Sequence, residues 1–517
     1  MKVKKMYTLD KKLENEQSIL RIRDFYGKKI NPTYILNTNN IDNSTKKFAF
    51  SLKNSYLSVK KIEVAKSVLK SILENPFAES IEICKRLKLT KEELKECYLI
   101  IQKTNIAQKI LESCFPRHYS FFRDRILFNF FWKKLFEGKN PYPIEVEIHP
   151  SERCNLRCQF CPTLNNDYKD QDYYQELKNK IKDRKVILNK VKSLFKELAS
   201  KGTKRIIFSG GKEPTLSPLI LDLIFSAKKS GLEVKITTNG SGLNMPKECD
   251  GQILSKDNLF KFYAENLDRI HLSLNASNRE TFNKVKGLNN DSVLFDQIVS
   301  NIKRIIFWRD KLRKEKKPSV EIYVAIVVDK ENYKNLPNVI EFIKNLGSDI
   351  ISINRYQYQM VEKKDIFNDK EMKDILRILK KIDEGWDSKK TRLIVSVEDL
   401  RNNYYKHILQ LKTRCWVACC ELTLNPVFLG LVCDTAAFPG REIFNGSNFR
   451  LGYIFDYPDF ESYWNHTYEF RKGLSTDKCN DCRFCHKLLN AYVEKLYNDY
   501  QNGFKLEDQP FYSIKGS

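Results

Sequence analysis

Three closely spaced cysteines give this sequence its clearest chemical signal. Cys154, Cys158 and Cys161 follow an extended apolar segment with the spacing CxxxCxxC. Thiolates on one short loop can face a common centre, but a closed zinc or iron–sulfur site needs four ligands. The loop therefore predicts a metal cluster with one coordination position left for another molecule. The alternative is a structural zinc loop that takes its fourth ligand from a distant part of the chain.

A second group of cysteines lies near the C-terminus. Seven of the fourteen cysteines fall between residues 415 and 485, and such bunching favours metal or cluster ligation over disulfides. The expected ligands are Cys415, Cys420, Cys433, Cys479, Cys482 and Cys485. Seven thiols are one short of two full sets, so we expect one complete cluster; a second would need an open position or His486 as a ligand. Cys419 and Cys420 cannot easily bind one metal together, and zinc remains the alternative here.

Polar turns follow several of the predicted strands. The stretch 209–216 reads Ser-Gly-Gly-Lys-Glu-Pro-Thr-Leu, with glycines at 210 and 211 and the acid Glu213 after Lys212. Two later strands end in Thr238-Asn239 and in Ser273-Leu274-Asn275. Taken singly, each of these is an ordinary polar turn.

The cysteine loop and the glycine turn together resemble the radical S-adenosylmethionine (SAM) superfamily. The resemblance implies that Cys154, Cys158 and Cys161 hold a [4Fe–4S] cluster whose open iron is chelated by SAM, with Phe160 beside the adenine. It also implies further cofactor-binding residues, which are Gly210, Gly211, Glu213, Thr238, Asn239, Ser273 and Asn275. We expect glycine at the turn because a Cβ would block the ligand's approach. Lys212, which precedes the acid, departs from the family's shorter form.

The late cysteines also resemble a known arrangement. Residues 430–434, 451–454 and Tyr463-Trp464, followed by a CxxCxxC, are similar to the SPASM/twitch extensions of radical SAM enzymes. This resemblance implies at least one auxiliary [4Fe–4S] cluster. It also implies a low-potential electron donor such as flavodoxin or ferredoxin.

The elements that must position these residues alternate between strands and helices. We predict strands at 144–148, 205–208, 234–237, 269–274, 320–328 and 349–353, with helices near 174–200, 218–230, 293–315 and 333–346. Six such strands indicate a parallel sheet with active residues at the C-terminal strand ends. The resemblance sharpens this α/β class to a partial (β/α)6 TIM-like barrel. We expect four regions: an N-terminal helical region at 1–140, the barrel at 141–360, a helical linker at 361–411 and a cysteine-rich cluster domain at 412–500.

The N-terminal region carries helical patterns but no catalytic residue types. Apolar residues recur at helical spacing from Ile62, and the stretch 90–93, Thr-Lys-Glu-Glu, predicts a capping box. A short helix, a turn and a capped helix resemble a helix-turn-helix, although a docking or packing module is the plainer interpretation. The aromatic, basic stretch 121–136 could lie on a membrane surface, but a packing helix explains it more simply.

Composition sets only broad limits on function. The chain has 517 residues and a formal net charge of +25, which favours anionic partners but also suits plain solubility in a lysine-rich protein. The N-terminus shows no signal-peptide pattern, and no apolar run reaches the ~18–20 residues of a membrane span. We therefore expect a cytoplasmic protein without a membrane span.

The expected function is that of a radical SAM oxidoreductase. Such an enzyme reductively cleaves SAM to a 5′-deoxyadenosyl radical, which abstracts hydrogen from an unactivated C–H bond. A basic surface and a separate helical module favour a peptide or protein substrate. The alternatives are a dehydrogenase or epimerase of a small alcohol, sugar or cyclitol, and a zinc-dependent nucleic-acid-binding protein; nucleic acid is not the expected partner.

Overall fold

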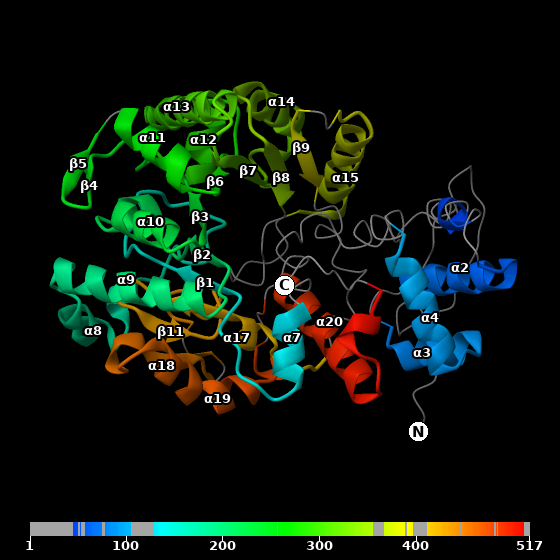
Figure 1. Ribbon diagram of the computed structural model, residues 1–517. Coiled ribbons are helices and arrows are strands. Elements are labelled where there is room, and N and C mark those ends of the chain that lie inside the picture. The colour runs from blue at the N-terminus through cyan, green and yellow to red at the C-terminus, as the bar shows by residue number, and fades with distance from the viewer. Residues whose placement is uncertain are drawn as a thin grey trace. The chain divides into compact units, whose positions relative to one another are not determined.

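The computed structural model describes most of the chain. The described residues are 45–49, 52, 57–74, 78–104, 129–255, 257–354, 367–387, 390–395, 411–441, 443–444, 447–479, 482 and 484–510. They form two compact units (Figure 1). One combines residues 1–141, 397–414 and 484–517, and the other combines residues 142–396 and 415–483. The domain limits expected above remain a prediction.

A ten-stranded sheet organises the larger unit. Its order is β14-β11-β10-β1-β2-β3-β6-β7-β8-β9; the strands from β10 to β9 run parallel to one another, whereas β11 is antiparallel to both β10 and β14. The strands on the β1 side are β1 (Glu145–Ile148), β2 (Arg205–Phe208), β3 (Glu233–Thr238), β10 (Glu421–Leu424), β11 (Leu429–Leu431) and β14 (Arg450–Tyr453). Those toward the other edge are β6 (Arg269–Ser273), β7 (Glu321–Val327), β8 (Ile350–Asn354) and β9 (Arg392–Val395). All six predicted strands are present, which confirms the α/β class with a central parallel sheet.

Helices follow the strands and cover one face of this sheet (Figure 1). They are α8 (Tyr174–Lys180), α9 (Arg184–Ser200), α10 (Ile220–Lys229), α11 (Asp257–Asn266), α12 (Arg279–Lys286), α13 (Leu294–Lys314), α14 (Leu336–Leu346) and α15 (Asp369–Glu384). Two short hairpins, β4 (Lys247–Cys249) with β5 (Gln252–Leu254) and β12 (Ile443–Phe444) with β13 (Ser447–Asn448), stand outside the sheet. The helix predicted at 174–200 is interrupted at 181–183, where Asp183 caps the start of α9.

The two faces of the strands differ sharply. Ile270 and Leu272, for example, are fully buried under the helices. The residues that alternate with them, Arg269 and His271, are partly exposed. Register places charged residues level with one another on this second face, here called the polar face. Its ion pairs are Arg205–Glu145 (3.6 Å), Arg205–Glu233 (3.1 Å), Lys235–Glu233 (3.0 Å) and Arg269–Glu321 (2.6 Å).

Two regions of the structure differ from what the sequence predicts. The expected helical linker at 361–411 contains α15 but also β9, which extends the parallel sheet past β8. The cysteine-rich segment also joins this sheet, because β10 pairs in parallel with β1 and continues through β11 to β14. The cysteine-rich segment also contains three short helices, which are α17 (Val417–Cys420), α18 (Phe460–His466) and α19 (Tyr468–Lys472).

The second unit is helical. It contains α2 (Val59–Glu74), α3 (Ser80–Leu87), α4 (Lys91–Gln102), α7 (Asn129–Phe136) and the C-terminal α20 (Phe484–Gln501). The predicted capping box is present, since Thr90 accepts from the Glu93 amide and the Glu93 carboxylate accepts from the Thr90 amide. Within the aromatic stretch, Phe136 of α7 contacts the rings of Tyr497 and Tyr500 on α20; residues 121–128 lie outside the described part.

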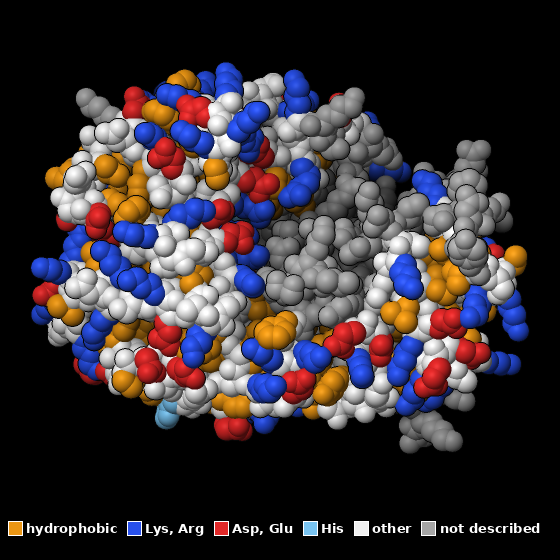
Figure 2. Space-filling model, in the orientation of Figure 1, with side chains coloured by type: hydrophobic (Ala, Val, Ile, Leu, Met, Phe, Trp, Pro, Cys, Tyr) orange, Lys and Arg blue, Asp and Glu red, His pale blue; other side chains and the backbone are white. Residues whose placement is uncertain are grey.

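The visible surface mixes charges of both signs. Figure 2 shows Lys and Arg interspersed with Asp and Glu over this face, without a patch of one sign. Among the described residues, no helix combines the length and the apolar composition needed to cross a membrane.

Candidate functional site

The loop after β1 brings its three cysteines together. Cys154 is exposed, and Cys158 and Cys161 are half-buried. The surrounding loop desolvates the Cys154 thiol and raises its pKa to about 11, with further increases from Cys158 and Cys161. Burial also raises the pKa of Cys158, and the charge on Cys161 adds to this. The three thiols are therefore close enough for the charge of one to raise the pKa of another, as is expected of ligands that face a common centre.

Neighbouring elements hold this loop in place. The Asn155 side-chain oxygen accepts hydrogen bonds from Asn239 Nδ2 (3.3 Å) and Ser241 Oγ (3.0 Å) beyond the end of β3. The Arg157 amide donates to the carbonyl of Lys286 (3.1 Å), the last residue of α12. Gly287 ends this helix at φ +64°, and a Cβ there would lie 2.5 Å from the Arg157 carbonyl oxygen. A larger residue at 287 would push the loop away.

The glycine turn after β2 is required by protein packing. Gly210 has φ +127°, and a Cβ on it would overlap the buried ring of His149. A Cβ on Gly211 would lie 2.8 Å from the Tyr168 hydroxyl and 3.0 Å from Pro439. Protein packing by itself therefore requires glycine at both positions, and our expectation that the missing Cβ admits a ligand stays a prediction.

Glu213 is buried and points toward the neighbouring strand end. One carboxylate oxygen accepts from the amide and hydroxyl of Thr215 and from the hydroxyl of Thr238, and the other accepts from the Asn239 amide (2.8 Å). The side chain therefore holds the ends of β2 and β3 together. Any additional bond to a ligand would have to use the oxygen that faces Asn239.

Lys286 is a residue that sequence reasoning missed. It is 1% exposed, its ammonium donates to Ser273 Oγ (3.1 Å), and it lies 5.4 Å from the centre of the Phe160 ring. Its charge lowers the pKa of Cys158, against the larger effect of burial. Two expected site residues, Ser273 and Phe160, thus meet a buried cation that no sequence motif marks.

Asn275 lies at the end of β6. Its side-chain oxygen accepts from the Val327 amide (3.1 Å), which ties β6 to β7. Within the described part of the chain, the buried Asn275 Nδ2 has no hydrogen-bond partner. A buried donor of this kind is costly unless a ligand or water accepts from it.

Four late cysteines form the second thiol group. The pKa of Cys415 is raised to about 12, first by burial, with a contribution from Cys479. The pKa of Cys482 is raised by the Cys479 hydrogen bond and by burial, with contributions from Cys415 and Cys433. Burial likewise raises the pKa of Cys433. The structure therefore brings Cys415, Cys433, Cys479 and Cys482 into one neighbourhood from three separate segments.

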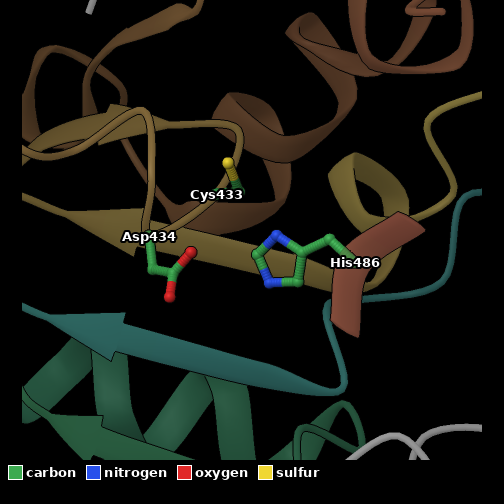
Figure 3. Close-up of side chains that lie close together, drawn as sticks. All are labelled: Cys433, Asp434 and His486. Carbon is green, nitrogen blue, oxygen red and sulfur yellow. The ribbon is translucent and has the colours of Figure 1, made fainter. Parts of the chain in front are cut away.

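The other expected ligands stand apart or lie outside the description. Cys420 is buried in α17. Its neighbour Cys419, and not Cys420 itself, is among the main charges that raise the pKa of Cys415. The side chain of Cys485 is outside the described part, and His486 belongs to the helical unit. Figure 3 shows Cys433 and Asp434 leaving the same turn after β11, and it also draws His486.

A buried acidic group joins the late segment to β1. Ligand oxygens of Glu147, Glu421 and Asp434 all lie within 4.8 Å of one another. Glu421 also accepts from the Asp434 amide (3.1 Å), and Glu147 lies 3.2 Å from His149 Nε2. The cysteine-bearing turn is therefore held directly against the strand that feeds the first cysteine loop.

This fold and this thiol loop define a class of protein. Residues 148–343 match the radical SAM superfamily model, a range that begins at the end of β1 and extends into α14. The matched segment is thus similar to radical SAM domains, which use SAM and a [4Fe–4S] cluster. The match confirms the recognition of this superfamily and of its cofactors from the sequence, whereas the roles of the individual loop cysteines stay a prediction.

Individual relatives are more distant. The chain is 30% identical over 204 residues to a tungsten-containing aldehyde ferredoxin oxidoreductase cofactor-modifying protein of Pyrococcus furiosus, covering 39% of this chain and 49% of that protein. It is 37% identical over 170 residues to an S-adenosylmethionine-dependent nucleotide dehydratase of Flammeovirga pacifica, covering 32% and 50%. The chain therefore spans about half the length of these curated relatives. Among solved structures, SuiB of Streptococcus suis aligns over 95% of both chains at 16% identity, with a TM-score of 0.45 that is too low to indicate function.

The residues present fit these cofactors. Three thiols can bind a cluster and leave one iron open, and Asn275 Nδ2, which has no partner among the described residues, offers a hydrogen bond just past the end of β6. The buried Lys286 ammonium donates to one described acceptor, so it can also bind an anionic group such as a carboxylate.

Proposed function

We propose that this protein is a radical SAM enzyme that abstracts hydrogen from a carbon of a peptide or protein substrate. The observation that carries the proposal is the meeting of three mutually interacting thiols with the Glu213-fixed strand ends inside the matched domain. When bound, the cluster and SAM supply an electron and a 5′-deoxyadenosyl radical.

The chain's own residues hold and orient these groups. Cys154, Cys158 and Cys161 would bind the cluster, and Lys286 would bind the SAM carboxylate close to Ser273 and Phe160. Glu213 fixes Thr238 and Asn239, and Asn239 in turn fixes the cysteine loop through Asn155. This network sets the position of SAM before it binds, which is how an enzyme directs a reactive cofactor toward one bond.

The late thiols would hold an auxiliary [4Fe–4S] cluster. Cys415, Cys433, Cys479 and Cys482 supply four ligands, as a complete site needs. A tetrahedral zinc site with Zn–S bonds of ~2.3 Å would bring its sulfurs within about 4 Å of one another. Zinc bound by the same four thiols is the alternative, and metal analysis of the purified protein separates the two.

The helical unit supports a peptide substrate, because a separate helical unit offers a surface that can bind a leader segment. However, residues 59–102, which hold α2, α3 and α4, carry nine basic and seven acidic side chains, so this part of the unit is close to neutral. Binding there would depend on apolar contacts more than on charge.

The test uses anaerobically reconstituted protein with dithionite as the reductant. We expect formation of 5′-deoxyadenosine and methionine, which Cys158→Ala should abolish. Adding the peptide fraction of a cell lysate should increase the rate, whereas the small-metabolite fraction should not. Stimulation by the metabolite fraction alone would favour a small alcohol or sugar substrate, and absence of SAM cleavage would reject the proposal.

A further inference from the structure

Lys212 interrupts the glycine–glutamate stretch, and its side chain contacts the segment that follows the cysteine loop. Its ammonium lies 2.7 Å from Asp167 Oδ1 and donates to the carbonyls of Asn166 (2.9 Å) and Thr163 (3.4 Å). The side chain is 11% exposed, so these contacts are largely shielded from water. The hydrogen bond from Lys212 is the main cause that lowers the pKa of Asp167.

A nearly buried ammonium with three acceptors differs from a surface ion pair. Exposed pairs contribute little, because water screens them and both side chains stay mobile. Here two of the acceptors are backbone carbonyls, so the lysine fixes the path of the chain as well as one carboxylate. Loss of the ammonium would leave these shielded acceptors without a donor.

The same segment touches both the thiols and the glycine turn. The Thr163 hydroxyl lies 3.2 Å from Cys161 Sγ and donates to the Gly211 carbonyl. Tyr168, at the other end of the segment, is buried and packs against Gly211. Lys212 therefore adds the only charged contact that these described residues make between the turn and residues 163–168.

We propose that Lys212 is a positioning residue that keeps the cysteine loop and the Gly210–Gly211 turn at a fixed separation for SAM binding. This inference rests on the proposed function. A ligand that must contact two elements binds more tightly when their spacing is set in advance, because it does not have to order them itself. Without Lys212, the thiols should still bind iron. SAM should bind more weakly, because the spacing of the two elements that it contacts is no longer fixed in advance.

The test compares Lys212→Met with a matched control, Lys169→Met. Lys169 lies 3.9 Å from the other oxygen of the same Asp167, but its side chain is 65% exposed. We expect Lys212→Met to keep the wild-type iron content and to weaken SAM binding about tenfold, measured by calorimetry on the reconstituted protein. The change that SAM causes in the electron paramagnetic resonance spectrum of the reduced cluster should require correspondingly more SAM.

The control and a conservative variant complete the design. Lys169→Met should bind SAM like the wild type, and Lys212→Arg should recover most of the affinity because it keeps the charge and several donors. Equal SAM affinity in Lys212→Met and Lys169→Met would overturn the inference, as would loss of iron from Lys212→Met. Wild-type protein that binds no SAM would instead reject the proposed function.

Discussion

At the scale of single residues, the polar face places a histidine in an unusual environment. In the register of β6 and β3, His271 lies opposite Thr237, next along this face to the Arg269–Lys235 pair, and its ring centre is 4.2 Å from that of Tyr323. Burial first, and then the charges of Arg269 and Lys235, lower the pKa of His271 to about 3. The imidazole is therefore neutral in the folded protein at neutral pH.

This depressed pKa predicts a pH-dependent stability. Below the ordinary histidine pKa of 6.5, the unfolded chain binds a proton that folded His271 does not, so its contribution is present above that pH. It is lost as the pH falls from 6.5 toward 3, by at most about 1.4 kcal/mol per pH unit. His271→Gln should therefore lose less stability than the wild type over this range in urea unfolding. The exposed His466→Gln variant should follow the wild type, and identical slopes for all three would contradict the prediction.

At the scale of elements, the C-terminal helix α20 completes the N-terminal helical unit. Asp499 is fully buried and accepts from the Ser80 amide and hydroxyl (2.7 Å each), Lys495 (2.9 Å) and Gln509 (2.9 Å). Phe504, beyond α20, belongs to the same apolar core as α2, α3 and α4. Deleting the N-terminal helices would therefore strip α20 of its partners, so point substitutions give a cleaner test of substrate docking.

Asp499→Ala should lower the free energy of unfolding of this unit more than a surface substitution does. Removing one member of a buried, fully bonded ionic network leaves Lys495 and the Ser80 amide without their acceptor, at a cost of roughly 3–5 kcal/mol. Asp456→Ala is the matched control, because Asp456 pairs with Lys180 but is 54% exposed. Chemical denaturation followed by tryptophan fluorescence should separate the two variants. A loss below about 1 kcal/mol in Asp499→Ala would contradict the assigned network.

At the scale of the whole molecule, the late cysteine segment is part of the radical SAM sheet. We expected a cysteine-rich cluster domain at 412–500; within it, β10 pairs with β1 and the turn after β11 carries Cys433. The next residues reach the first site, since Ala437 accepts from the Tyr168 hydroxyl (3.1 Å) and Pro439 packs on Gly211. The two thiol groups therefore share structural support.

Because the two thiol groups share structural support, we predict that cysteine changes at the two sites have different effects on SAM binding and on the late cluster. The triple change of Cys154, Cys158 and Cys161 to Ala should remove SAM cleavage and leave the late cluster, because the late thiols do not depend on that loop. The double change of Cys415 and Cys433 to Ala should remove the late cluster and also weaken SAM binding, through the turn that contacts Tyr168. Iron analysis, paramagnetic resonance and SAM calorimetry measure both effects. Zinc without iron in the triple variant, or wild-type SAM affinity in the double variant, would contradict this account.

The sequence alone determined the class of this protein. Cysteine spacing, the glycine turn and the alternation of strands and helices are local patterns, so they predicted the thiol loop, the parallel sheet and the capping box at Thr90. Only the tertiary structure brought Cys415, Cys433, Cys479 and Cys482 into one neighbourhood, because three distant segments supply them. It also gave Lys286 and Lys212 their surroundings, since a lysine shows its partner only when the chain is folded. Local periodicity encodes elements, whereas burial and pairing arise from contacts between residues far apart in the chain.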